Sequence, residues 1–151
     1  MSGVSKAIVQ PLLSWYDAGH RDLPWRSEPA PYRVWVSEIM LQQTRVEAVR
    51  GYFSRWMNAL PDIPALAAAD EAVYTKLWEG LGYYSRVRNL HRAAVLLCEE
   101  YGGELPADYD RLLALPGVGE YTAGAVASIA FGLPVPAVDG NVLRVAARLD
   151  N

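Results

Sequence analysis

Two carboxylates of this 151-residue chain have surroundings that favour opposite protonation states. Glu38 lies in an otherwise apolar, helix-forming stretch between Trp35 and Met40, with no basic residue one helical turn away. Burial raises the pKa of a carboxyl group, which suits a general acid near neutral pH. Asp139 stands where a last helix is expected to begin, and the N–H groups and dipole of a helix start favour the ionised form.

One protonated acid and one persistent anion are what cleavage of an N-glycosidic bond requires. The acid lets the base leave as a neutral molecule, and the anion stabilises the cationic sugar. Position alone leaves a second interpretation open, in which Glu38 faces solvent and Asp139 only caps a helix.

The stretch RLLALPGVGEYTAGAVASIAFGLPVPAVDGN, residues 111–141, would position the second carboxylate. A short apolar helix is expected to end at Leu115, and a helix of small residues is expected from about Glu120 to Phe131. Gly117 and Gly119 between them can adopt positive φ angles, so the turn can be tight with its N–H groups exposed.

Exposed N–H groups at a helix start attract an anion, because the helix dipole adds to their own partial charges. The turn therefore predicts a clamp for a nucleic-acid phosphate that reads shape rather than sequence. Its residues are Leu115, Gly117, Val118 and Gly119. An ordinary corner between two helices is the alternative.

Apolar residues recur at helical spacing and no stretch alternates like a strand, which predicts an all-α protein of short helices. The first helix is expected to begin near Pro11 and to end at Gly19. Further helices are expected over residues 31–44, 46–60, 63–69, 71–80, 85–101, 120–131 and 141–149. Asp70 and Asp108 are expected to cap helices. Residues 20–30 are expected to form a loop.

Composition limits the possible functions. At 52% apolar the chain can bury one core, and no apolar run is long enough to cross a bilayer. Residues 1–10 do not resemble a signal peptide, so a cytoplasmic location is expected. Cys98 is the only cysteine, and with His20 and His91 it cannot form a zinc site. The net charge of −3 argues against a general nucleic-acid coat, although arginines gather at 45–55 and 86–92.

Five motifs follow one another in a diagnostic order: PWR at 24–26, SEIMLQQT at 37–44, GLGYYSRVRNL at 80–90, LPGVGEYTAGA at 115–125 and VDGNV at 138–142. Together they resemble the MutY family of adenine DNA glycosylases, within the helix-hairpin-helix base-excision superfamily. The resemblance runs from about Leu12 to the last residue. It implies a bacterial, nucleoid-associated, monomeric repair enzyme that removes adenine mispaired with 8-oxoguanine or guanine from double-stranded DNA.

The resemblance also implies a fold. Residues 26–133 would form a six-helix barrel, with the helix-hairpin-helix at about 109–131. Residues 1–25 and 134–151 would belong to a second, iron–sulfur helical domain that is incomplete. The family's [4Fe–4S] ligands and C-terminal domain would lie beyond Asn151, so no cofactor or metal site is expected within this chain, and we expect the natural protein to continue.

Roles carry over by motif. Glu38 resembles the acid that protonates adenine, Asp139 the carboxylate that stabilises the oxocarbenium-like centre, and Asn141 a residue that orients the water or the acid. The remaining matches are Trp25 and Arg26 in the adenine pocket, Gln43 and Thr44 at 8-oxoguanine, Leu81 and Tyr83 in the gap left by the flipped adenine, and Arg86 with the hairpin at the DNA backbone.

Tyr121, directly after the hairpin, matches a position where some members of the family carry a catalytic tyrosine and others a serine. The same position distinguishes two related chemistries. Endonuclease III-type enzymes place a lysine just after the hairpin, which forms a Schiff base and cuts the strand. Here that position is Tyr121, and residues 111–141 contain no lysine. We therefore expect a monofunctional glycosylase. An endonuclease III-like glycosylase/lyase, a DNA-binding fragment without chemistry and a partly folded piece are the alternatives.

Overall fold

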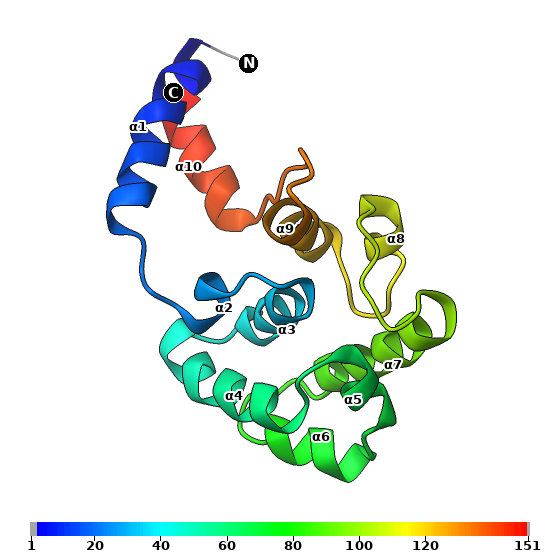
Figure 1. The fold of residues 1–151 in the computed structure, drawn as a ribbon. Coiled ribbons are helices and arrows are strands. Elements are labelled where there is room, and N and C mark those ends of the chain that lie inside the picture. The colour runs from blue at the N-terminus through cyan, green and yellow to red at the C-terminus, as the bar shows by residue number, and fades with distance from the viewer. Residues whose placement is uncertain (1–2, 151) are drawn as a thin grey trace. The chain divides into compact units, whose positions relative to one another are not determined.

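The computed structural model describes the backbone of residues 3–150 and the side chains of residues 6–150. All regular elements in these residues are helices, which confirms the predicted all-α class. They are α1 (Gly3–Gly19), α2 (Pro24–Ser27), α3 (Pro31–Leu41), α4 (Val46–Ala59), α5 (Ile63–Ala68), α6 (Glu71–Trp78), α7 (Ser85–Glu100), α8 (Tyr109–Leu113), α9 (Glu120–Phe131) and α10 (Gly140–Asp150) (Figure 1). Residues 1, 2 and 151, which belong to the predicted second domain, lie outside the described residues.

The chain divides into two compact units. Unit 1 is Met1–Leu23 with Val138–Asn151, and unit 2 is Pro24–Ala137. Unit 1 holds α1 and α10, which contact each other. Apart from Leu23, every buried hydrophobic side chain among the described residues belongs to unit 2. Unit 2 therefore has a hydrophobic core of its own.

Helix α3 lies at the centre of unit 2 and contacts α2, α4, α7 and α9. Pro31 opens it, as predicted, at a position where a missing N–H costs nothing. Seven of its 11 residues are buried. It ends at Leu41, three residues earlier than predicted, because Gln43 adopts a φ of 58° that an α-helix cannot continue through.

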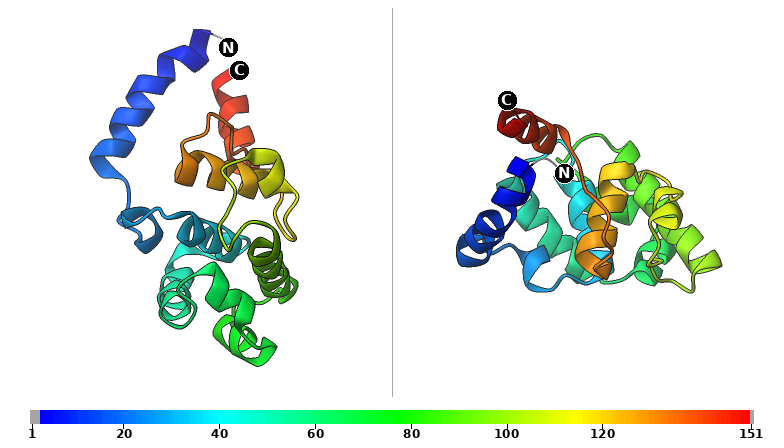
Figure 2. Two further views of the ribbon diagram at one scale, coloured as in Figure 1. Left: turned by 45° about the vertical axis from the view of Figure 1, so that its right-hand side comes forward. Right: turned by 90° about the horizontal axis from the view of Figure 1, so that it is seen from above.

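Helix α9, orange in Figure 2, packs on α3. Ala123, Ala125 and Ala127 are buried, and their small side chains allow this close packing. At Gly124 an added Cβ would lie 2.2 Å from the carbonyl oxygen of Pro136, so the returning chain needs a glycine there.

Four further predicted details of the helices are wrong. Helix α1 begins at Gly3 and contains Pro11, so Pro11 does not open it and only removes one internal N–H donor. Trp25 and Arg26 belong to α2, not to a loop. Helix α6 ends at Trp78, and the side chain of Asp70 accepts no cap hydrogen bond at its start. The predicted cap at Asp108 is confirmed, since its Oδ1 accepts the N–H of Arg111 at 2.9 Å.

Helices of the described chain are all too short or too polar to cross a membrane.

Candidate functional site

The turn between α8 and α9 is built on a buried apolar pair. Leu115 and Val118 point into the core, and the N–H of Val118 donates to the carbonyl of Leu115 at 3.1 Å. The Val118 N–H is therefore used inside the turn. The contribution of Leu115 and Val118 is to hold the turn in shape, whereas an approaching anion would meet the exposed Gly117 and Gly119.

The two turn glycines differ, since only Gly117 uses the positive φ that both were expected to be able to adopt. Gly117 has a φ of 76°, and a Cβ there would lie 2.8 Å from the Cβ of Asn89 on α7. Gly119 has a φ of −95° and a ψ of −179°, an extended conformation open to any residue, and a Cβ there would meet nothing within 4 Å. Of the two turn glycines, only Gly117 must be a glycine, because of both its backbone conformation and its close approach to Asn89.

Gly119 also occupies the N-cap position of α9, where it offers no side-chain acceptor. The N–H groups of the first turn of a helix have no acceptor within the helix. Because the site is exposed and the helix dipole is positive there, it suits a phosphate oxygen. The carboxylate of Glu120 in the same turn partly offsets that charge.

Glu38 is carried by the central helix α3 and is half-buried, so neither the fully buried nor the solvent-facing interpretation holds. Tyr121 lies in the first turn of α9 and is 38% exposed. Helices α3 and α9 pack together, and the Nε2 of Gln42 donates to the Oγ1 of Thr122 at 3.3 Å. Thr122, the residue after Tyr121, is thus hydrogen-bonded to Gln42 at the end of α3, the helix that carries Glu38.

Trp25 and Arg26, predicted to line an adenine pocket, have different environments. Trp25 is 6% exposed, and its ring packs edge-on against Phe53 with centroids 5.3 Å apart. Most of the indole is therefore buried in the core of unit 2, and the role of Trp25 in an adenine pocket stays a prediction. Arg26 is exposed at the surface.

Two short loops of unit 2 each contain a non-glycine residue with positive φ. Gln43 after α3 has a φ of 58°, and Tyr83 before α7 has a φ of 45°. Such residues are uncommon and are concentrated where function requires a particular geometry. Tyr83 is 67% exposed and Gln43 is exposed, while the hydroxyl of Thr44 donates to the carbonyl of Gln42 at 3.4 Å.

Leu81, predicted to lie in the gap left by the flipped adenine, has a buried side chain. It is 7% exposed, so its side chain is already part of the core of unit 2. Tyr83, two residues later, is the side chain that this loop presents to solvent.

The contacts of Arg86 also differ from those predicted. Its motif predicted a contact with the DNA backbone, but its guanidinium donates to main-chain carbonyls of the protein. It also lies over the ring of Trp78, 5.1 Å from the centroid. Burial lowers the pKa of Arg86.

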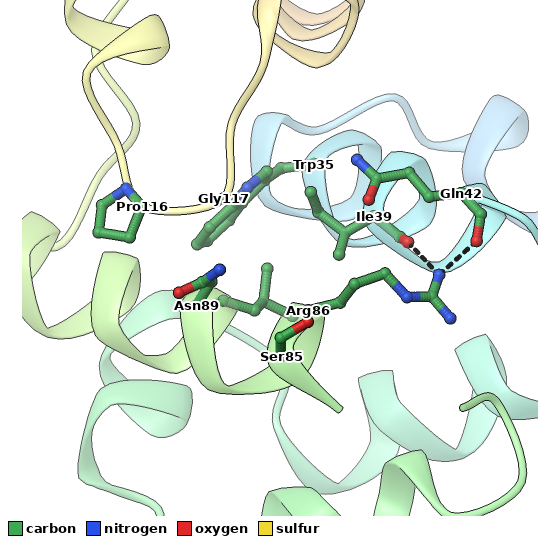
Figure 3. A pocket seen from close by; sticks show the side chains of 9 residues that line it. Trp35, Ile39, Gln42, Ser85, Arg86, Asn89, Pro116 and Gly117 are labelled. Carbon is green, nitrogen blue, oxygen red and sulfur yellow. Dashed lines mark hydrogen bonds between the residues drawn. The ribbon is translucent and has the colours of Figure 1, made fainter. Parts of the chain in front are cut away.

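A pocket of about 130 Å³ lies between Arg86 and Gly117 (Figure 3). Its other lining residues are Trp35, Ile39, Gln42, Ser85, Asn89, Leu90 and Pro116.

Asp139 and Asn141 belong to unit 1. Oδ1 of Asp139 accepts the N–H of Val142 at 2.8 Å, which confirms the predicted helix cap at the start of α10. Nδ2 of Asn141 lies 3.5 Å from Oδ2 of Asp139, and Oδ1 of Asn141 accepts from Arg144 at 3.1 Å. Oδ1 of Asp139 thus caps the helix backbone, whereas Oδ2 has only the longer contact with Asn141 among these hydrogen bonds.

The described side chains include no group of three or more His, Cys, Asp or Glu that could hold a metal ion. A [4Fe–4S] cluster of the kind that the resemblance implies needs four thiolates. Cys98 is a single half-buried thiol, so these residues do not fit that cluster.

The sequence reasoning missed Asn89, which fixes how closely the hairpin turn approaches α7. It named Gln43 as a contact to 8-oxoguanine but did not predict the positive φ of that residue. Neither an asparagine nor a glutamine signals these features by its residue type.

Comparisons with known proteins match most of this chain. A family profile described as HhH-GPD superfamily base excision DNA repair protein matches residues 36–151. An adenine DNA glycosylase of Mus musculus is 52% identical over 147 residues, 91% of this chain and 28% of that protein. One of Mycolicibacterium smegmatis is 48% identical over 138 residues, 91% of this chain and 47% of that protein. This chain therefore spans less than half the length of either relative.

Solved structures show the same fold. A thermostable thymine-DNA glycosylase superposes with a TM-score of 0.90 at 28% identity, covering 98% of this chain and 71% of that one. A trapped endonuclease III–DNA covalent intermediate superposes with a TM-score of 0.82 at 27% identity, covering 97% and 68%.

Proposed function

The chain belongs to the HhH-GPD superfamily of base excision DNA repair proteins, and from this we propose that it carries the catalytic residues of a monofunctional adenine DNA glycosylase. The substrate would be adenine mispaired with 8-oxoguanine or guanine in double-stranded DNA. The observation that carries the proposal is the 48–52% identity to adenine DNA glycosylases over nine-tenths of this chain. The residues that the family profile matches, 36–151, include both candidate carboxylates.

The proposed reaction is hydrolysis of the bond between adenine and its sugar. Glu38 donates a proton to a ring nitrogen of adenine, so that the base leaves neutral. Asp139 stabilises the positive charge that develops on the sugar as the bond breaks. Water then adds to the anomeric carbon and loses a proton, which restores the acid. Asn141, beside Asp139, would orient the water or the acid. Tyr121 would be the fourth catalytic residue.

Adenine must leave the base stack to be attacked, at a cost of a few kcal/mol. The exposed hairpin turn with the first turn of α9 supports a phosphate contact, since it offers N–H groups and a positive helix end. Gln43 and Tyr83 are exposed on adjacent loops of unit 2 and would contact the opposite base and the gap. The net charge of −3 suits a local grip rather than a general attraction to DNA.

A glycosylase/lyase is the second candidate, favoured by the likeness to the endonuclease III covalent intermediate. It would need an amine near the hairpin, yet residues 111–141 contain no lysine and the chain has only Lys6 and Lys76. Lys76 lies in α6 and pairs with Glu79.

The test is a single-turnover incubation with a duplex that contains one 8-oxoguanine·adenine pair, analysed with and without alkali. We expect strand breaks only after alkali, because hydrolysis leaves an intact abasic strand. Breaks without alkali would favour the glycosylase/lyase instead.

A monomeric state and a cytoplasmic, nucleoid-associated location in a bacterium are further parts of the proposal.

A further inference from the structure

Arg86 joins two loops through one guanidinium group. Its Nη1 donates to the carbonyls of Ile39 at 2.8 Å, Met40 at 3.2 Å and Gln42, all at the end of α3. Its Nη2 donates to the carbonyls of Leu81 at 3.1 Å and Gly82 at 3.3 Å. Figure 3 shows the side chain reaching from α7 to the end of α3. The two nitrogens thus serve two segments about 40 residues apart in sequence.

The carbonyls that Arg86 binds stand next to the two strained positions. Gln42 directly precedes Gln43, and Gly82 directly precedes Tyr83, the non-glycine residues with positive φ. A strained backbone persists only where surrounding contacts over-determine it. The guanidinium supplies such contacts at both places, and its carbon lies 6.0 Å from the centroid of the Tyr83 ring.

We propose that Arg86 is a positioning residue that holds Gln43 and Tyr83 at a fixed spacing, so that the two side chains read the base opposite the excised adenine as one unit. This inference rests on the proposed function for what is read. It assigns Arg86 no contact with DNA, because its Nη groups are occupied by the protein.

Arginine suits this task better than lysine. Its planar fork offers two nitrogens in a fixed relation, one for each loop, whereas a lysine ammonium is a single point charge on a flexible stem. Arg86→Lys therefore keeps the charge but loses the fixed link between the loops. Arg88→Lys, the same change at an exposed position on the same helix, is the matched control.

The experiment has two readouts on the 1–151 chain. Hydrogen exchange of the backbone is followed in segments 42–45 and 81–84. Affinity is measured for duplexes with a cleavage-resistant, 2′-fluorinated adenosine opposite 8-oxoguanine or guanine. We expect Arg86→Lys to speed exchange in both segments and to reduce the preference for 8-oxoguanine by about fivefold or more, the usual lower range for coupled sites. Arg88→Lys should change neither.

A second variant tests the coupling even if Arg86→Lys folds poorly. Tyr83→Val disfavours the left-handed conformation in one loop only, since β-branched residues avoid it. The inference expects faster exchange in segment 42–45 as well.

Faster exchange confined to the altered loop, or an unchanged 8-oxoguanine preference in Arg86→Lys with loosened loops, would overturn the inference. A wild-type chain without any preference would instead contradict the proposed substrate, and the exchange readout would still decide whether Arg86 couples the loops.

Discussion

At the scale of single residues, the hairpin turn depends on one glycine more than on the other. Gly117 combines a φ of 76° with close approach to α7, since a Cβ added there would lie 2.8 Å from the Cβ of Asn89. Gly119 is extended and open. A sequence shows two equivalent glycines here, and only the backbone separates their roles.

Gly117→Ala should lower the free energy of unfolding by about 2 kcal/mol or more, because a left-handed alanine costs about 1–2 kcal/mol and the overlap with Asn89 adds to it. Gly119→Ala should cost less than about 1 kcal/mol, the range for a changed N-cap. Urea unfolding of both variants measures the difference. Equal losses would contradict the distinct roles of the two glycines.

At the scale of elements, α3 positions the site because it contacts four other helices and carries Glu38. Its packing on α9 needs small residues, and Gly124 is the extreme case, since the carbonyl of Pro136 approaches it directly. Gly51 on α4 is also a helical glycine, but a Cβ there would meet only the flexible end of Arg55 at 3.3 Å.

The same substitution should therefore have opposite effects in these two helices. Gly51→Ala should stabilise the chain by up to about 1 kcal/mol, the gain in helix propensity. Gly124→Ala should destabilise it by about 1–3 kcal/mol, because overlap with backbone outweighs that gain. Thermal melts of the two variants give the signs, and a stabilising Gly124→Ala would show that residues 132–137 move aside freely.

Sequence reasoning succeeded for elements whose signals are local. Asp108 and Asp139 accept the N–H groups expected of caps, and Pro31 opens α3. It failed where backbone or distant contacts decide. Pro11 lies inside α1, although a proline is more common in the first turn of a helix than in its interior. The partners of Arg86 are main-chain carbonyls, which every residue possesses, so no spacing in the sequence reveals them.

At the scale of the whole molecule, the candidate residues are divided between two units. Glu38, Tyr121 and the hairpin belong to unit 2, and Asp139 and Asn141 belong to unit 1. Unit 2 contains all but one of the buried hydrophobic side chains of the described residues, while α10 contains none. Folding therefore depends mainly on unit 2, whereas the proposed chemistry needs residues of both units.

Residues 24–137 alone should melt cooperatively, because the core of unit 2 is complete without α1 and α10. They should retain affinity for duplex DNA through the hairpin but release no adenine, since Asp139 is absent. Circular dichroism, duplex titration and base release check the three parts. Adenine release by residues 24–137 would remove Asp139 from the mechanism.

The central claim is that Glu38 drives adenine release, and Glu38→Gln tests it most directly. Single-turnover release from an 8-oxoguanine·adenine duplex is measured for the chain, for this variant and for Glu99→Gln, an exposed control on α7. We predict release by the unaltered chain and by the control, and a rate about 10²–10⁴-fold lower for Glu38→Gln at unchanged duplex affinity, the usual contribution of a general acid. An undiminished rate in Glu38→Gln, or no adenine released by the unaltered chain, would contradict the account.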